Sequence, residues 1–467
     1  MQKYYENILK ETIENIYNKE NFKKFTNEML NGYKLIQHSL VSYYPSEHIN
    51  NLNLLGEYED NEGNKIHILE VELKTPRKLE NARAAQRNLI AKYLEDNWLD
   101  GALVSFYAPD CSHWRFSFVK IAWEFDEKNK KTKKILSPAR RYSFLIGEGE
   151  PSHTAQSQLS PLLKQKEAPI LEQIEEVFSI ERVTKEFFKE YKNLFDILVK
   201  KLGNNHSFKI EALKNNINTE NFAKKLLGQI VFLYFLQKKG WLGVPANKTW
   251  GEGDKYFLRH LFEKSRNESK NFFNDYLEYL FYNTLNNPRS NIVDPSYSSY
   301  FKSRIPFLNG GLFEPKYDWK NSFIYIDDKI FEKILDVFDL YNFTVKEDEP
   351  LEKEVAVDPE MLGKVFENLL DENLRKGKGT YYTPREIVHY MCRESLVNYL
   401  VAESKIDEKR IRKLFYWDVI TSNEDVIKAK ESKNNINSKS KPLVFWEGEA
   451  KQLEKILKDI KIVDPAC

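Results

Sequence analysis

The spacing of apolar residues changes after about residue 50 of the chain. Over residues 1–45 apolar positions recur every three or four residues, which predicts helices. From residue 52 the period falls to two, which predicts strands. The expected strands cover residues 52–59, 65–74, 101–107 and 113–123, and a helix is expected over residues 79–97. Residues 1–150 should therefore form an α/β domain around a mixed sheet.

Residues 151–345 are expected to form a helical connector. Within it, residues 223–239 read AKKLLGQIVFLYFLQKK and are apolar on nearly every side, which predicts a buried helix that ends at Gly240. Tyr and Phe are dense over residues 272–313. This density fits either platforms on which nucleic-acid bases stack or an ordinary aromatic core.

Residues 346–467 are expected to open a third domain. Asp358 and Pro359 fit the N-cap and the first position of a helix. Residues 431–441 are polar and low in complexity, and we expect them to be disordered. Residues 462–467 read IVDPAC, a strand followed by the start of a turn. A domain does not end on such an opening, so we expect the sequence to stop inside an incomplete domain.

Charge and composition exclude several classes of protein. The 467 residues include 71 Lys and Arg against 70 Asp and Glu, which gives a net charge of +1. This balance argues against a polybasic coat but is compatible with a local basic groove. The three cysteines lie far apart and show no metal-binding or disulfide spacing. No apolar run is long enough to span a bilayer, so we expect a cytoplasmic protein without a membrane partner.

One expected strand carries candidate chemistry. Residues 66–74 read IHILEVELK, and because strand side chains alternate between faces, Glu70, Glu72 and Lys74 should project to one side. Two carboxylates on a buried strand are costly unless they serve a function. A Mg²⁺-dependent nuclease uses such groups, since carboxylates hold the cation and an ammonium orients the attacking water. Solvated charges at an exposed strand end are the alternative.

The sequence Glu72-Leu73-Lys74 resembles the acid-x-Lys core of the PD-(D/E)XK nuclease superfamily, over roughly residues 45–125. The resemblance implies a Mg²⁺ ion held by Glu72 and by an acid on the preceding strand. Glu57 is the expected second ligand, and two further acids are candidates for that position: Glu59 and Asp60. A second register, Glu70-Val71-Glu72, puts a glutamate in the place of the lysine and predicts a nuclease fold without activity.

The helix expected after this strand adds further candidates. Gln86 is expected to be catalytic, together with Glu70, Glu72 and Lys74. Arg83 and Arg87 are four residues apart and share a helix face. We expect these two arginines to contact the phosphates of double-stranded DNA.

A second resemblance lies near the end of the chain. In GTYYTPREIVHYM (residues 379–391), Thr383 fits a helix N-cap and Pro384 the first helical position. This segment and the Asp464-Pro465-Ala466-Cys467 ending resemble the amino-terminal signatures of adenine-N6 DNA methyltransferases. The resemblance implies a Rossmann-like domain in which both segments line a pocket for S-adenosylmethionine. The cofactor-binding residues that it implies are Tyr382, Thr383, Pro384, Asp464, Pro465 and Ala466.

Three more segments, FLQKKGWLGV (235–244), PFLNGGLFEP (306–315) and DPEMLGKVFENLL (358–370), are similar to those before the methyltransferase core of Eco57I-like type IIG restriction–modification proteins. Such proteins join nuclease, helical connector, methyltransferase and target recognition in one chain. We therefore expect the nuclease-plus-connector part of a combined endonuclease and adenine methyltransferase, without methyl-transfer residues of its own. The alternatives are a methyltransferase whose N-terminal fold binds DNA without cutting it, and a remnant with only a scaffold role.

Overall fold

The computed structural model describes residues 2–126, 131–134, 139–289, 294–308, 311–344, 351–359, 363, 383, 385–415 and 447–462. By its internal contacts the chain divides into two compact units, Met1–Asp371 and Glu372–Cys467. The first unit contains both the N-terminal sheet region and the helical region that follows it.

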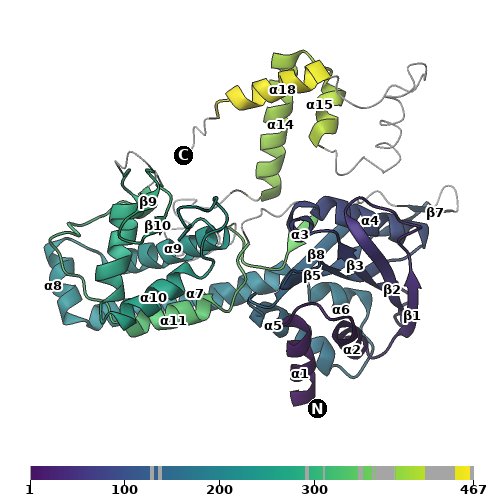
Figure 1. Cartoon of the computed structure of the whole chain (residues 1–467), viewed down its shortest axis with the longest axis horizontal. Helices are drawn as coiled ribbons and strands as arrows, with labels where there is room; N and C mark the ends of the chain where they lie inside the picture. The colour runs from purple at the N-terminus through teal and green to yellow at the C-terminus, as the bar shows by residue number, and fades with distance from the viewer. Residues whose placement is uncertain are drawn as a thin grey trace. The chain divides into compact units, whose positions relative to one another are not determined.

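A seven-stranded mixed sheet forms the centre of the N-terminal region (Figure 1). The strand order is β1-β2-β3-β4-β5-β8-β11; β3 is parallel to β4 and β8 to β11, while the other neighbours are antiparallel. The expected mixed α/β fold of this region is thus confirmed. The strands are Lys34–Ser39 (β1), Ile49–Glu59 (β2), Lys65–Leu73 (β3), Gly101–Tyr107 (β4), His113–Lys120 (β5), Arg140–Gly147 (β8) and Glu352–Glu354 (β11), beside a separate hairpin of Trp123–Asp126 (β6) and Lys131–Lys134 (β7).

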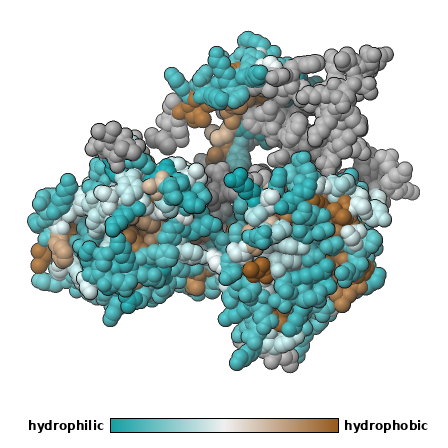
Figure 2. Space-filling view, in the orientation of Figure 1, coloured by the Kyte–Doolittle hydropathy of each residue, from teal (hydrophilic) through white to brown (hydrophobic). Residues whose placement is uncertain are grey.

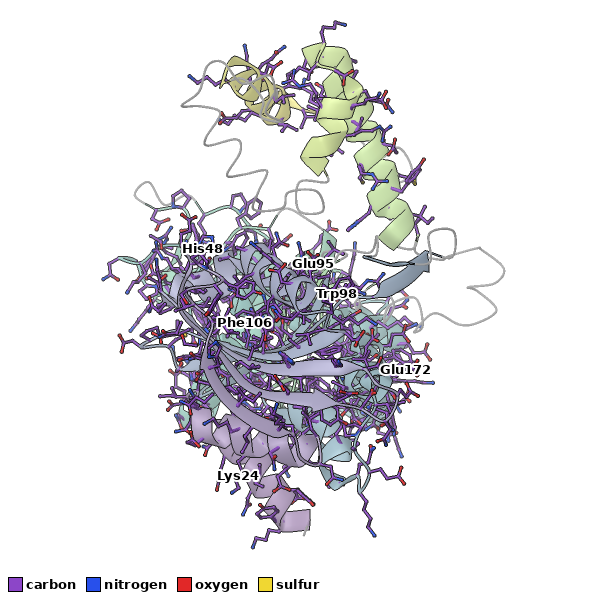
Figure 3. The ribbon with its side chains drawn as sticks, turned by 90° about the vertical axis from the view of Figure 1, so that its right-hand side faces the viewer. Lys24, His48, Glu95, Trp98, Phe106 and Glu172 are labelled. Atoms are coloured by element: carbon purple, nitrogen blue, oxygen red, sulfur yellow. The ribbon has the colours of Figure 1, made fainter. Side chains whose placement is uncertain are left out.

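Helices cover both faces of the sheet. The helices involved are α1 (Gln2–Ile13) and α2 (Lys19–Met29) on one face and α3 (Pro76–Asn81) and α4 (Arg83–Asp96) on the other. Figure 3 shows α2, marked by Lys24, and α4, marked by Glu95, on opposite sides of the strands.

The alternation of β3 assigns each of its side chains to one of these faces. Ile66 and Ile68 pack into the core under α1 and α2. Leu69 and Val71 pack into the core under α3 and α4. Because side chains two apart share a face, Glu70 and Glu72 continue the row of Ile66 and Ile68 and lie on the α2 face.

The helical region of the first unit follows the sheet. Its helices are α5 (His153–Lys164), α6 (Leu171–Glu176), α7 (Ile180–Asn204), α8 (His206–Lys214), α9 (Thr219–Lys238), α10 (Phe257–Asn267) and α11 (Asp328–Phe338), with π-helical segments Phe272–Leu277 and Tyr279–Leu285, a 3₁₀ turn Gly311–Phe313 and short strands Tyr297–Ser298 (β9) and Ser303–Arg304 (β10). The expected buried helix is α9, which is buried along most of its length. The chain leaves α9 through Gly240, whose φ of +70° favours glycine.

The aromatic segment of this region packs mainly inward. Phe272, Phe273, Tyr276, Phe281 and Tyr282 are all buried, so the interpretation as an aromatic core is confirmed for these described residues. The surface of the region is mostly hydrophilic in the face shown in Figure 2, with apolar surface at the end formed by α8. That helix exposes two apolar side chains, Ile210 and Leu213.

After the helical region the chain returns to the N-terminal sheet as β11. Glu352 pairs with Arg141 and Glu354 with Ser143 in the register of β11 and β8. The N–H of Arg141 donates to the carbonyl of Leu351 at 2.8 Å, and the N–H of Val355 donates to that of Ser143 at 2.9 Å. Residues 352–354, near the expected start of a third domain at residue 346, are therefore part of the first sheet.

The second unit contains three described helices, α14 (Arg385–Ser404), α15 (Glu408–Phe415) and α18 (Glu447–Asp459). A small core holds them together and consists of Val397, Leu400, Ile406, Ile411 and Leu453. Two bidentate pairs, Arg412 with Glu394 and Arg410 with Glu449, add charge-assisted hydrogen bonds at 2.7–2.9 Å. The expected disordered segment and the expected final strand lie outside the described residues.

Candidate functional site

Glu70 lies in a buried polar network on the α2 face and is 3% exposed. Its Oε1 accepts a hydrogen bond from the Tyr17 hydroxyl at 2.9 Å. Its Oε2 accepts one from the Asn53 amide at 2.9 Å and lies 3.0 Å from the Lys19 ammonium. Burial, and then the charge of Glu70, raise the pKa of Tyr17 well above its usual value, so this hydroxyl remains a donor. The turn between α1 and α2 thus satisfies a buried carboxylate.

Glu72 lies two residues further along, at the carboxyl end of β3, and is partly exposed. Its oxygens accept hydrogen bonds from the Asn50 amide at 3.0 Å and from the Asn51 amide at 2.7 Å. Lys74 follows β3 and is exposed, and among the described residues no ion pair joins it to Glu72. Glu72 and Lys74 are therefore the two predicted catalytic groups that face solvent at this end of the sheet.

At the carboxyl end of β3, Glu72 is the one predicted metal ligand that is available, and a metal site built on two acids needs a second carboxylate. The described residues include no group of three or more His, Cys, Asp and Glu that could hold a metal ion. Glu70 is engaged by three donors, one of them the Lys19 cation. A Mg²⁺ ion that keeps most of its waters can be held by a single carboxylate. The residues present therefore fit such an ion at Glu72, and not an ion shared by two acids.

Glu57, the expected second metal ligand, lies away from Glu72. It stands opposite His67 in the register of β2 and β3, and Lys34 contacts its carboxylate at 3.0 Å. His67 contacts Tyr93 of α4 at 2.6 Å, and directly paired residues share a face, so Glu57 lies on the α4 face. Five residues of strand separate His67 from Glu72, or roughly 16 Å. The structure does not bring the two acids together.

The other two acids considered for this position have different surroundings. Glu59 is exposed at the end of β2. Asp60 is buried and accepts hydrogen bonds from the backbone N–H groups of Glu62, Asn64 and Leu171. Burial raises the pKa of Asp60. These hydrogen bonds and that of the Asn64 side chain lower it by a larger amount, so that the pKa lies below its usual value. Asp60 thus fixes the turn between β2 and β3 and does not face Glu72.

Arg83, Gln86 and Arg87 lie across the sheet from Glu70 and Glu72, because α4 covers the opposite face. Gln86 is 1% exposed, and its amide donates to the carbonyl of Lys78 at 2.7 Å. The side chains of Arg83 and Arg87 are 12% and 2% exposed. Phosphate contacts need exposed guanidinium groups, so this placement does not support the predicted DNA contacts of Arg83 and Arg87. It likewise gives Gln86 a structural hydrogen bond and no contact with Glu72.

The two arginines belong to a buried arginine–glutamate cluster between α4 and the sheet. Its members are Arg83, Arg87, Arg115, Arg141, Glu80, Glu352 and Glu354. Arg115 contacts Glu354 at 2.9 Å and Glu80 at 2.8 Å, and Arg141 lies over the ring of Phe106 at 4.3 Å. Four guanidinium groups here face three carboxylates, two of which come from β11.

Three members of this cluster, Arg115, Arg141 and Glu354, remain charged at neutral pH. Burial lowers the pKa of Arg141 to about 9, which still leaves it protonated. Burial also lowers the pKa of Arg115. Glu354 and Glu80 raise it by a larger amount, so that the pKa lies above its usual value. Burial raises the pKa of Glu354, and Arg115 and Arg83 more than reverse this. These three groups therefore carry buried charges that must compensate one another.

Sequence reasoning missed the donors to the glutamates and five of the seven members of the cluster. Asn51 and Asn53 alternate along β2 and stand opposite Glu72 and Glu70 in register, so a strand alignment could have found them. Lys19 comes from a helix start far away in sequence and gives no local signal. The sequence around the two glutamates of β11 is typical of a solvent-exposed segment, and only the fold shows that they lie beside the arginines.

Of the six predicted cofactor-binding residues, Thr383 is described, and it is exposed. α14 begins at Arg385, close to the expected helix start. Tyr382, Pro384, Asp464, Pro465 and Ala466 lie outside the described residues, so their roles stay predictions. Among the described helices, none is long and apolar enough to cross a membrane.

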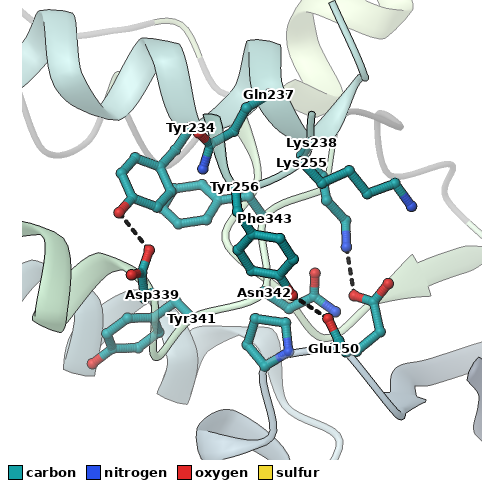
Figure 4. Close-up of a pocket in the computed structure, with 12 residues that line it drawn as sticks. Glu150, Tyr234, Gln237, Lys238, Lys255, Tyr256, Asp339, Tyr341, Asn342 and Phe343 are labelled. Atoms are coloured by element: carbon teal, nitrogen blue, oxygen red, sulfur yellow. Dashed lines mark hydrogen bonds and ion pairs between the residues drawn. The ribbon is translucent and has the colours of Figure 1, made fainter. Parts of the chain in front are cut away.

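A small cavity of about 40 Å³ lies where the N-terminal region meets the helical region (Figure 4). Lys238 contacts Glu150 at 2.6 Å on one side of it. On the other, Asp339 accepts hydrogen bonds from Tyr234 at 2.6 Å and from Arg259 at 2.7 Å. This volume suits a few water molecules and is far below that of a substrate pocket. The cavity therefore belongs to a joint between the two regions.

Comparison with known proteins finds a protein to which part of the chain is similar. A stretch of 249 residues, 48% of the chain, is 32% identical to a protein of Methanocaldococcus jannaschii named "Putative type II restriction enzyme and methyltransferase". The match covers 20% of that protein, so the chain spans only about a fifth of the length of this relative. No protein-family model matches the chain, and no solved structure is significantly similar to it. The similarity supports the expected restriction–modification class and does not test the Eco57I-like features.

Proposed function

We propose that the chain is the nuclease-like and connector part of a DNA restriction–modification enzyme. The similarity to the Methanocaldococcus jannaschii protein supports this class. The proposed activities of the intact enzyme are methyl transfer from S-adenosylmethionine to adenine N6 and Mg²⁺-dependent cleavage of double-stranded DNA. The part of this chain that meets the DNA is the exposed carboxyl end of β3.

The observation that carries the cleavage proposal is the placement of Glu72 beside Lys74 at that end. The amides of Asn50 and Asn51 hold the Glu72 carboxylate in place, and Lys74 is left to contact a ligand. A Mg²⁺ ion at Glu72 would supply Lewis acidity to a phosphodiester. The Lys74 ammonium would orient the attacking water and stabilise the charge that develops on the phosphate. Glu70, behind Tyr17, positions the strand.

Glu72→Gln and Lys74→Ala should each lower the rate of plasmid cleavage in the presence of Mg²⁺ by at least about 100-fold. Both side chains reach solvent, so thermal unfolding should hardly change. The matched control is Lys65→Ala, which removes an exposed lysine at the opposite end of β3 and should leave cleavage intact. Cleavage that persists in both site variants would remove Glu72 and Lys74 from the reaction.

An N-terminal domain that binds DNA without cutting it is the second candidate. Two observations favour it: Glu70 is already neutralised by Lys19, and Glu57 lies on the other face of the sheet. This function predicts that the purified protein binds duplex DNA but does not cleave it when Mg²⁺ or Mn²⁺ is added. Cleavage that depends on Glu72 excludes it.

A further inference from the structure

Three cations follow Glu72 in the sequence and have no carboxylate partner among the described residues. We call Lys74, Arg77 and Lys78 the β3–α3 cationic surface. Lys74 and Arg77 are exposed, and Lys78 is partly exposed. In the part of the chain that the structure describes, no ion pair is found for any of the three. This is a local excess of positive charge in a chain whose net charge is +1.

The neighbouring groups explain why these charges are not neutralised. Glu72 is the carboxylate closest in sequence to Lys74, but two asparagine amides engage its oxygens. Elsewhere on the same sheet a strongly exposed lysine does find a partner, since Lys34 contacts Glu57 at 3.0 Å. Lys74, unlike Lys34, has no such partner among the described residues.

His48 reports the positive potential of the surface. The N–H of Lys74 donates to the carbonyl of His48 at 3.1 Å, and Figure 3 shows His48 on the α4 side of the strands, away from Lys24. Burial lowers the pKa of His48, and Lys78 and Lys74 lower it further against the opposing charge of Glu47. The ammonium groups of Lys74 and Lys78 therefore both raise the electrostatic potential at His48.

The backbone that carries these cations is held in place. Leu79 is fully buried under α3, and Gln86 of α4 donates to the carbonyl of Lys78. Arg77 and Lys78 are consequently presented from a fixed helix, which lowers the entropy lost when they bind a ligand. A group of cations without ion-pair partners among the described residues attracts a polyanion to the carboxyl end of β3.

We propose that the β3–α3 cationic surface binds the phosphate backbone of double-stranded DNA and holds it against Glu72. The nature of the ligand rests on the proposed function, but the contact does not depend on whether the protein cuts DNA. In this proposal the surface makes the phosphate contacts expected above for Arg83 and Arg87, whose side chains are buried.

The test is the salt dependence of duplex DNA binding, measured by fluorescence anisotropy in EDTA so that cleavage plays no part. Arg77→Ala/Lys78→Ala should lower the slope of log affinity against log salt by about 2 and weaken binding about tenfold at low salt. The matched control is Lys200→Ala/Lys201→Ala, which removes two exposed charges from α7 and should leave the slope unchanged. Arg77→Lys/Lys78→Arg should keep the original slope, because phosphate contacts need the charge.

The outcomes separate this inference from the proposed cleavage. A shallower slope confined to Arg77→Ala/Lys78→Ala supports the inference even for a protein that never cuts DNA. Equal slopes in this variant and in the α7 control overturn it, even for a protein that does cut. Absence of any salt-dependent duplex binding by the unaltered protein also overturns it.

Discussion

Replacement of Glu354 by Gln should destabilise the protein by about 3–5 kcal/mol. The substitution keeps the size of the side chain but removes the charge that contacts Arg115 at 2.9 Å and faces Arg83 at 3.7 Å. Arg115 is 1% exposed, so water cannot replace the lost carboxylate. Glu80 stays in contact with Arg115 but is the only carboxylate that contacts it in the described structure once Glu354 is neutral. The measurement is the free energy of unfolding in urea.

The control for this prediction is Glu57→Gln, which removes the partner of Lys34. The Lys34 side chain is 73% exposed, so its ion pair is screened by water and should contribute at most about 1 kcal/mol. Equal losses of stability in the two variants would show that the arginine–glutamate cluster contributes no more than a surface pair.

The effect of Glu354 should also depend on pH. Burial raises the pKa of Glu354, but Arg115 and Arg83 lower it more, so its folded pKa lies below the unfolded value of about 4.3. A group with a lowered pKa stabilises the fold above the unfolded pKa, and the contribution disappears as pH falls through the folded pKa. The difference in unfolding free energy between the unaltered protein and Glu354→Gln should therefore be constant near neutral pH and shrink below pH about 4.

Gly147→Ala should cost about 3 kcal/mol of stability through steric conflict and backbone strain. Gly147 is the last residue of β8 and has a φ of +124°, a backbone conformation that residues other than glycine rarely adopt. A Cβ there would lie 2.5 Å from the carbonyl oxygen of Ser112 and 2.6 Å from the Cα of His113. Both are backbone atoms beside the paired strand β5, so neither can move without disturbing the sheet.

Gly63→Ala separates the two causes of this loss. Gly63 also has a positive φ, +85°, but no atom lies within 4 Å of the position of its Cβ. The strain alone should cost about 1 kcal/mol. Thermal or urea unfolding of both variants measures the difference, and a Gly147→Ala protein as stable as Gly63→Ala would contradict the steric part of the argument.

The alternation of apolar residues predicted β2 to β5 well, because each of these strands has at least one buried face. It failed for β1, where the side chains are exposed or only partly buried and no alternation arises. β11 could not be recognised either. Its sequence, Glu352-Lys353-Glu354, resembles a solvated loop, and only the arginines of α4, β5 and β8 make it a buried strand.

The candidate site could be predicted in part for a similar reason. The two-residue period places Glu70 and Glu72 on one face without any knowledge of the fold. Which face α4 covers is a property of the crossover between β3 and β4, and no local pattern reveals it. Arg83, Gln86 and Arg87 were therefore grouped with the wrong side of the sheet.

The position of β11 in the chain affects how the protein is made. β8 and β11 are adjacent in the sheet but roughly 200 positions apart in sequence. At the usual pace of translation, about 10–40 s pass between the synthesis of one and of the other. Throughout that interval the nascent chain contains Arg115 and Arg141 but lacks Glu352 and Glu354. A gene interrupted before codon 352 should consequently yield a product that proteases remove.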